Sequence, residues 1–145
     1  MRNLIDKVFG ARSRLTELEK LILDSVRERL AEPIVTLWDK QIDAINKVQR
    51  LPGGVEVDFY RIKNGRPSFD AKLSFQNKTT ELLIAKVQIE LTNMGKMTAQ
   101  VWCIKGFLFS IEYEGNIGYF DKAVRLSPKP AFRLNCELIA DLAST

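Results

Sequence analysis

The first third of the chain carries apolar residues at helical spacing. They recur at alternating intervals of four and three positions, at Leu4, Val8, Ala11, Leu15, Leu18 and Ile22. Residues with this spacing lie on one stripe of a helix, so the pattern predicts either one helix over residues 3–31 or two helices that meet at residues 10–13. Thr16 and Glu19 have the spacing of a capping box, which signals a helix start. The stripe would also suit a coiled-coil dimer, but it lasts for only about three heptads, and we expect it to pack on the sheet of its own chain.

A second amphipathic segment begins at Pro33, a residue that fits the first turn of a helix. Its apolar face consists of Ile34, Trp38, Ile42 and Ile45. Pro52 and the two glycines after it predict the end of this helix. Residues 1–52 are therefore expected to form a helical layer.

From Val55 onward the apolar residues alternate with polar ones, which is typical of strands. Short segments that contain Asn, Gly or Lys separate five alternating runs and predict a series of hairpins. The runs are 55–62, 67–76, 81–91, 97–104 and 107–114. Their odd-numbered positions are apolar, and the residues expected in the core include Val57, Phe59, Leu73, Val87, Val101 and Phe109.

The hairpin loops follow from this alternation. Directly paired antiparallel residues share a face, so an apolar odd-numbered face requires loops with an odd number of residues. We therefore expect three-residue bulged loops at 63–65 and 104–106 rather than two-residue turns. This register pairs Phe59 with Phe69 on the core face.

The chain after the fifth run is less regular. Tyr119 and Phe120 could begin a sixth strand, and residues 132–142 are a short apolar segment that we expect to end as a helix. The predicted fold is one α+β domain over residues 1–145, with two N-terminal helices packed on one face of a five- or six-stranded antiparallel meander sheet. In this fold the sheet spans residues 55–120, and residues 121–145 add an irregular segment and a short C-terminal element.

Five apolar residues interrupt the polar pattern on the opposite face of the predicted sheet. This predicted apolar cluster comprises Leu82, Ile84, Trp102, Ile104 and Leu108. The register places Ile84 beside Ile104 and Trp102 beside Leu108, and a patch of this kind is usually covered. Three covers stay open: the C-terminal segment with Phe132, Leu134, Leu138 and Ile139, a second copy of the chain, or a ligand or heterologous partner. Trp102 would be the anchor of an intermolecular contact.

Composition removes many reaction classes. The chain has 46% apolar and 28% charged residues, no histidine and two cysteines, so it cannot build histidine bases, Cys/His nucleophile pairs or zinc sites of histidine or four cysteines. Cys103 and Cys136 are expected to be small buried hydrophobes. The best carboxylate pair, Glu90 and Glu112, is predicted to flank Thr98, but alternating Glu is ordinary on a solvated strand. We predict no catalytic residue, no metal site and no cofactor.

The net charge of +4 is spread evenly along the chain. Two groups of basic residues are candidates for phosphate contacts. They comprise Arg61, Lys63, Arg66, Lys122, Arg125, Lys129 and Arg133. The longest aliphatic run, residues 82–85, is far shorter than the ~20 residues that span a bilayer, so we expect no membrane segment and a cytoplasmic location.

Taken together, these patterns favour a non-enzymatic cytoplasmic protein-interaction module, a small adaptor or inhibitor-like subunit that acts as an oligomer. Its partner would be another protein or a second copy that forms a homodimer. Two alternatives stay open: a small-molecule-binding domain with a pocket between helices and sheet, and a weak nucleic-acid binder that uses the basic loops.

Overall fold

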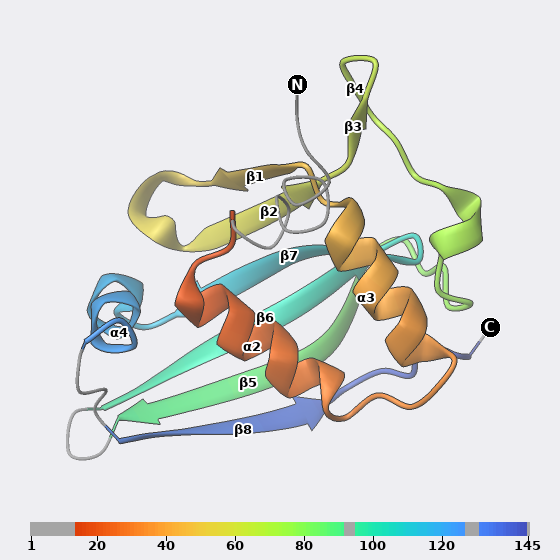
Figure 1. Cartoon of the computed structure of the whole chain (residues 1–145). Helices are drawn as coiled ribbons and strands as arrows, with labels where there is room; N and C mark the ends of the chain where they lie inside the picture. The colour runs from red at the N-terminus through yellow and green to blue at the C-terminus, as the bar shows by residue number, and fades with distance from the viewer. Residues whose placement is uncertain (1–13, 92–94, 127–130, 145) are drawn as a thin grey trace.

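The fold combines one antiparallel sheet with helices on a single face, as expected for an α+β domain (Figure 1). The computed structural model describes residues 14–91, 95–126 and 131–144. The described helices are α2 (Glu17–Arg27), α3 (Ile34–Ala44) and α4 (Ile117–Ala123). The six strands of the sheet lie in the order β1 (Lys47–Arg50), β2 (Glu56–Tyr60), β7 (Phe107–Glu114), β6 (Gly95–Ile104), β5 (Leu82–Leu91) and β8 (Phe132–Leu138).

The strand order differs in part from a simple meander. β5, β6 and β7 are consecutive hairpins, whereas the β1–β2 hairpin pairs with β7 and β8 pairs with β5. A separate two-stranded ribbon contains β3 (Ile62–Lys63) and β4 (Arg66–Pro67), and two short 3-10 turns are η1 (Pro52–Gly54) and η2 (Ala71–Leu73). Two elements at the ends of the sheet, β1 and β8, are therefore absent from the predicted set of strands.

Helix α2 begins with the predicted capping box. The Thr16 hydroxyl accepts a hydrogen bond from the Glu19 backbone N–H at 3.1 Å, and Glu19 Oε1 accepts one from the Thr16 N–H at 2.8 Å. Leu18 and Ile22 are buried in the core, so the stripe packs on the sheet of its own chain. The predicted part of this helix over residues 3–13 lies outside the described residues.

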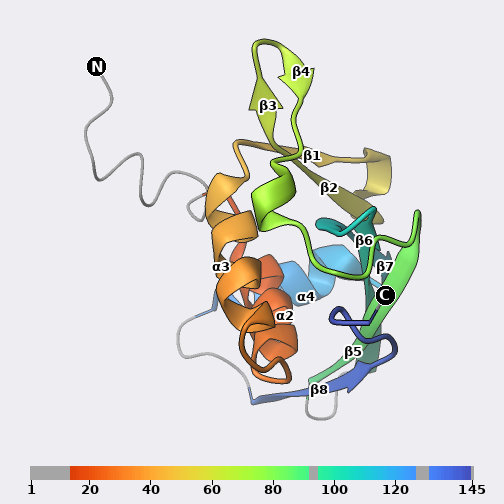
Figure 2. The same cartoon turned by 90° about the vertical axis from the view of Figure 1, so that its right-hand side faces the viewer.

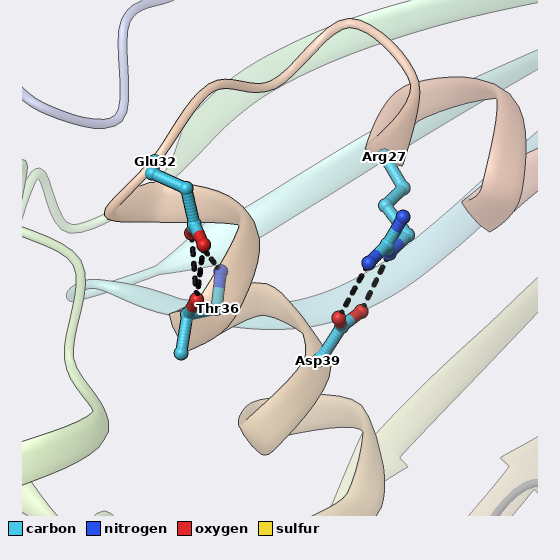
Figure 3. A network of polar contacts seen from close by, with 4 residues as sticks. All are labelled: Arg27, Glu32, Thr36 and Asp39. Carbon is cyan, nitrogen blue, oxygen red and sulfur yellow. Dashed lines mark hydrogen bonds and ion pairs between the residues drawn. The ribbon is translucent and has the colours of Figure 1, made fainter.

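Polar contacts fix α3 beside α2 (Figure 3). Arg27 donates two hydrogen bonds of 2.8 Å to the two carboxylate oxygens of Asp39. Pro33 at the N-cap has no side-chain donor or acceptor, and Glu32 instead accepts from the Thr36 N–H at 2.9 Å and from the Thr36 hydroxyl at 2.6 Å. The start of this helix is therefore capped by the residue before the proline.

The prediction that this helix continues to residue 52 is wrong. It ends at Ala44, and Lys47–Arg50 form strand β1. The Asn46 side chain accepts a hydrogen bond from the Ile62 N–H at 2.7 Å and donates one to the Ile62 carbonyl oxygen at 2.8 Å. An asparagine that bonds to backbone in this way competes with helix continuation.

Both predicted three-residue loops are in fact two-residue turns. Asn64 and Gly65 have φ values of 54° and 76°, and Lys105 and Gly106 have φ values of 49° and 90°. Positive φ at both central residues is the geometry of a type I′ hairpin turn. The predicted length of the 104–106 loop is wrong because a bulge in the following strand, rather than the loop, keeps the apolar residues on one face, and the 63–65 hairpin lies in the separate β3–β4 ribbon.

That bulge lies in strand β7. The pairing register shifts after Trp102, so that Trp102 pairs with Ser110 and Cys103 pairs with Leu108. Phe109 is the extra residue of the bulge. Val101 consequently pairs with Ile111 rather than with Phe109, and the expectation that Phe109 belongs to the buried core is wrong.

The predicted strand 67–76 is also wrong. Pro67 ends β4, and the Asp70 carboxylate accepts a hydrogen bond from the Lys72 N–H at 3.0 Å, which favours the short turn η2 over an extended strand. Phe69 is 51% exposed, so it does not pair with Phe59 on the core face. Phe75 reaches the core by a different route and stacks on Trp38, with 6.3 Å between the ring centroids.

Two expectations for the last part of the chain are corrected. Tyr119 and Phe120 belong to α4, because the Asn116 side chain accepts from the Tyr119 N–H at 3.1 Å and caps a helix there. Residues 132–138 form β8, since their apolar residues alternate and pair with β5, and the end of this segment, residues 139–142, is not the expected helix.

The core lies between the helices and the inner face of the sheet. Val57, Phe59, Val87 and Val101 are buried there as predicted, whereas Leu73 lies in η2 outside the sheet. Both cysteines are free and buried, and burial raises the pKa of the Cys103 thiol. A thiol in this state is inert toward electrophiles and acts as a small apolar side chain.

Candidate interaction surface on the outer face of the sheet

The outer face of the sheet is the one opposite the helices. Figure 2 shows α2, α3 and α4 on one side of the sheet, and none of the described helices on the other. Seven side chains near the middle of this face form what we call the Trp102 patch. It comprises Glu56, Asp58, Tyr60, Trp102, Ile104, Phe109 and Glu112.

The predicted apolar cluster does not assemble as expected. Ile84 and Leu108 are 1% and 0% exposed and lie in the core, so their expected place on the outer face is wrong. The register shifts in β5 and β7 turn these two side chains inward. Leu82 is also packed against the core, and Leu83 is the residue directly opposite Trp102. Of the cluster, Trp102 and Ile104 remain on the outer face.

The C-terminal segment does not cover Trp102. It forms the edge strand β8, and Phe132, Leu134 and Leu138 pack against the core on the same side as α2. Ile139 follows the strand and is 44% exposed. The intramolecular cover considered from the sequence is therefore wrong.

Aromatic rings cross three neighbouring strands of the Trp102 patch. The rings of Tyr60 and Phe109 meet edge to face, with 5.4 Å between their centroids and 89° between their planes. Lys47 Nζ lies 5.9 Å from the centroid of the Tyr60 ring. Trp102 and Phe109 line an open cavity of about 240 Å³. Phe109 joins these rings only because the bulge turns it outward.

Carboxylates surround these rings. Glu56 and Glu112 are directly opposite each other on β2 and β7, and Asp58 is opposite Ser110. Glu112 Oε1 accepts a hydrogen bond from Trp102 Nε1 at 3.3 Å, which orients the indole ring. Within the described part of the chain, none of the three carboxylates takes part in an ion pair.

The close approach of Glu56 to Asp58 affects the pKa of Glu56. The pKa of Glu56 is raised, first by its hydrogen bond to Asp58, then by burial and by the Asp58 charge. Asp58 is 7% exposed, and its Oδ1 has no hydrogen-bond partner among the described residues. Burial and the charges of Asp58 and Glu56 also raise the pKa of Tyr60. The patch is therefore a site of unbalanced negative charge beside aromatic surface.

The predicted phosphate-contacting residues are not brought together. Lys63 and Arg66 are on the β3–β4 hairpin, far from α4, which carries Lys122 and is followed by Arg125, in both Figure 1 and Figure 2. Arg125 is 3.3 Å from the Asp121 carboxylate. Arg133 is exposed on the edge strand β8, and Lys129 lies outside the described residues.

Arg61 is a buried residue rather than a surface one. Its guanidinium donates to the carbonyl oxygens of Gln41 and Leu108, and burial lowers its pKa to about 10. The Gln41 side chain completes this buried network, since it donates to the Leu73 and Gly106 carbonyl oxygens and accepts from the Leu108 N–H. The sequence feature that could have indicated this network is Gln41, a polar residue between the apolar residues Trp38 and Ile42 on the buried side of α3.

The carboxylate pair Glu90 and Glu112 does not flank Thr98. Glu90 pairs with Lys96, and Glu112 pairs with Gln100, so the two acids are in different rows of the sheet. In the three described ranges, no group of three or more His, Cys, Asp or Glu residues is placed to hold a metal ion.

Comparison of the chain with protein-family models, with curated proteins and with solved structures finds no match in any of the three. Among the helices that the structure describes, none has the length and apolar character needed to cross a membrane. The functional argument therefore depends on the residues of the Trp102 patch.

Proposed function

We propose that this chain is a protein-interaction module that binds a cationic segment of another protein through the Trp102 patch. The observation that supports the proposal is a partly exposed tryptophan beside three carboxylates that have no ion pair among the described residues. The role is that of a small adaptor or inhibitor-like subunit.

The patch has the composition of an interface anchor. Tryptophan and tyrosine dominate the energetics of protein interfaces because they bury a large area at a low entropic cost. Trp102, Phe109 and Tyr60 project from adjacent strands, which hold them about 5 Å apart in the direction across the sheet. A rigid sheet therefore presents three rings to one partner.

Charge selects the partner. The hydrogen bond to Asp58, followed by burial and the Asp58 charge, raises the pKa of Glu56, and a bound lysine or arginine would offset the repulsion between these two acids. The same cation can lie over an aromatic face, where the ring quadrupole attracts it. Complementary charge also speeds encounter and excludes partners of the wrong sign.

The alternatives fit this surface less well. In a symmetric homodimer the same patch would face itself, which would bring the carboxylates of both copies together. A nucleic acid would bring phosphates to the same carboxylates, which repel them. A cationic protein segment is the partner whose chemistry complements the patch.

Titration calorimetry with a blocked oligo-arginine peptide tests the proposal. We expect binding to the wild-type chain and no binding of an oligo-glutamate peptide of equal length. Trp102→Ala and Glu112→Gln should each weaken binding by about tenfold or more, or ~1.4 kcal/mol. Glu137→Gln is the matched control, since it removes the same charge from the exposed end of β8.

Two outcomes would contradict the proposal. Equal loss of affinity in Glu137→Gln and Glu112→Gln would show that the peptide is attracted to acidic residues in general rather than bound at the Trp102 patch. A homodimer in sedimentation that Trp102→Glu converts to monomer would show that a second copy covers the patch.

A further inference from the structure

A second cavity lies on the helix side of the sheet, at the end where α4 meets the start of α2. We call it the α4 cavity; it has a volume of about 220 Å³ and is lined by residues of α2, α4, β7 and the β1–β2 connection. These elements gather at one end of the sheet in Figure 1. The cavity therefore lies between helices and sheet, the position that the sequence left open for a small-molecule pocket.

Two buried polar atoms that line this cavity lack partners among the described residues. Tyr113 is 7% exposed, and its Oη has no hydrogen-bond partner. Asp121 Oδ1 is buried and likewise has none. Buried polar atoms are nearly always hydrogen-bonded to protein, water or a ligand, so these two atoms give the cavity a place where a polar ligand group could be held.

The other charged groups of the cavity are already engaged. Glu19 accepts hydrogen bonds from Arg50 at 2.7 and 3.1 Å, and from the Thr16 N–H. The second oxygen of Asp121 is 3.3 Å from an Arg125 nitrogen. Tyr113 Oη and Asp121 Oδ1 are consequently the two atoms of this group that remain available to a ligand.

The chemistry of these two atoms defines the ligand. A carboxylate oxygen only accepts hydrogen bonds, and the phenol is protonated because burial, followed by the charges of Glu19 and Asp121, raises the Tyr113 pKa. Arg50 pairs with Glu19 and Arg125 pairs with one oxygen of Asp121, which leaves Asp121 Oδ1 as an acceptor that needs a donor. An ammonium group can donate both to Asp121 Oδ1 and to the Tyr113 phenol oxygen, whereas a carboxylate or an ionised phosphate has no proton to donate to Asp121.

The walls of the cavity add an apolar requirement. Val57, Ile117 and the ring of Tyr113 supply apolar surface, and Gly54 allows close approach, since a Cβ there would lie 3.4 Å from Ile117 Cγ2. The volume corresponds to roughly seven water-sized groups at ~30 Å³ each. We propose that the α4 cavity binds a small primary amine with a short apolar body, whose ammonium group is held by Asp121 Oδ1 and Tyr113 Oη.

Three molecules that share one apolar body test this site: n-butylammonium, n-butanol and butyrate. Binding is followed by NMR titration of the folded chain at millimolar ligand. We expect n-butylammonium to shift the resonances of Tyr113 and Asp121 in a saturable way, n-butanol to bind at least tenfold more weakly, and butyrate not to bind.

Conservative variants localise the effect. Asp121→Asn should weaken n-butylammonium binding at least tenfold, and Tyr113→Phe should weaken it severalfold. Tyr119→Phe and Glu137→Gln, which change the same chemical groups outside the cavity, should leave it unchanged. All of these variants retain Trp102 and Glu112, so this test is separate from that of the proposed interaction surface.

The contrary results are equally clear. Absence of a saturable shift with n-butylammonium, or equal binding of butyrate, would overturn the proposal. So would unchanged affinity in Asp121→Asn, because the ammonium group would then lie elsewhere. A folded Tyr113→Phe variant with wild-type affinity would remove the phenol from the site.

Discussion

The backbone carbonyl oxygen of Gln41 accepts two hydrogen bonds from the guanidinium of Arg61, at 3.1 and 3.3 Å. The arginine is 9% exposed, and burial lowers its pKa to about 10 against a smaller opposing effect of Cys103. A third hydrogen bond of 2.9 Å goes to the Leu108 carbonyl oxygen. Helix α3 and strand β7 are therefore joined through one buried cation that is satisfied by backbone oxygens.

We predict that Gln41→Leu destabilises the chain by about 3 kcal/mol or more. The Gln41 side chain is the hydrogen-bond partner of three backbone groups, of which those of Gly106 and Leu108 are buried and that of Leu73 is half-buried. A buried group that loses its partner costs ~1–3 kcal/mol. Urea unfolding gives the difference directly. Gln49→Leu, at an exposed position of β1, is the control and should change the free energy of unfolding by less than ~0.5 kcal/mol.

The parts of the fold that follow from local periodicity could be predicted from the sequence. The capping box of Thr16 and Glu19, the burial of Trp38 and the inward side of β5 depend on spacing within one element. The elements that local spacing did not predict are determined by contacts between residues distant in the sequence. The strand β1 follows a helix-like pattern and is set by the contact between Asn46 and Ile62, which are distant in sequence.

The candidate site was harder to predict because a single extra residue in a strand changes the face of the sheet on which the side chains before it lie. A bulge at Phe109 exchanges the faces of Leu108 and Phe109, and no local signal distinguishes that arrangement from a three-residue loop. The prediction therefore placed Trp102 and Ile104 on the outer face but missed Phe109, and with it the contact between the Phe109 and Tyr60 rings. Glu56 and Asp58 are even-numbered residues of the predicted run 55–62, but their proximity to Glu112 depends on the pairing of β2 with β7, which local spacing does not reveal.

The bulge predicts unequal effects for two apolar residues near the same turn. Leu108→Ala should cost ~2–5 kcal/mol, since it empties a position that is 0% exposed. Ile104→Ala should cost clearly less, because Ile104 is partly exposed on the outer face. Thermal and urea unfolding of both variants provide the comparison. Equal costs would mean that Leu108 does not occupy the core.

Glu56 predicts a dependence of stability on pH. Its pKa is raised in the folded chain, so the folded state binds this proton more tightly than the unfolded state does. The stability that this proton supplies is present below the ordinary pKa of glutamate and is lost as pH rises through the raised pKa. Glu56→Gln should therefore melt at a higher temperature than wild type at neutral pH, and this advantage should shrink in acid.

A matched substitution checks the cause of that effect. Glu137→Gln should not reproduce the pH-dependent gain, because Glu137 lies opposite Lys86 on the neighbouring strand rather than beside another carboxyl group. A Glu56→Gln variant that is less stable than wild type at neutral pH would show that the ionised carboxylate is stabilised in the fold.

The two tryptophans should differ in how readily a soluble quencher reaches them, because one is in the core and the other is on the outer face. Trp38 is 0% exposed, whereas Trp102 borders the open cavity of the outer face. We expect acrylamide to quench the fluorescence of Trp102 preferentially, and Trp102→Phe to leave emission that is largely protected. If a cationic segment covers the Trp102 patch, saturating oligo-arginine peptide should protect the wild-type chain and leave the Trp102→Phe variant unchanged. Quenching that the peptide does not alter, although calorimetry shows binding, would place the peptide on another surface.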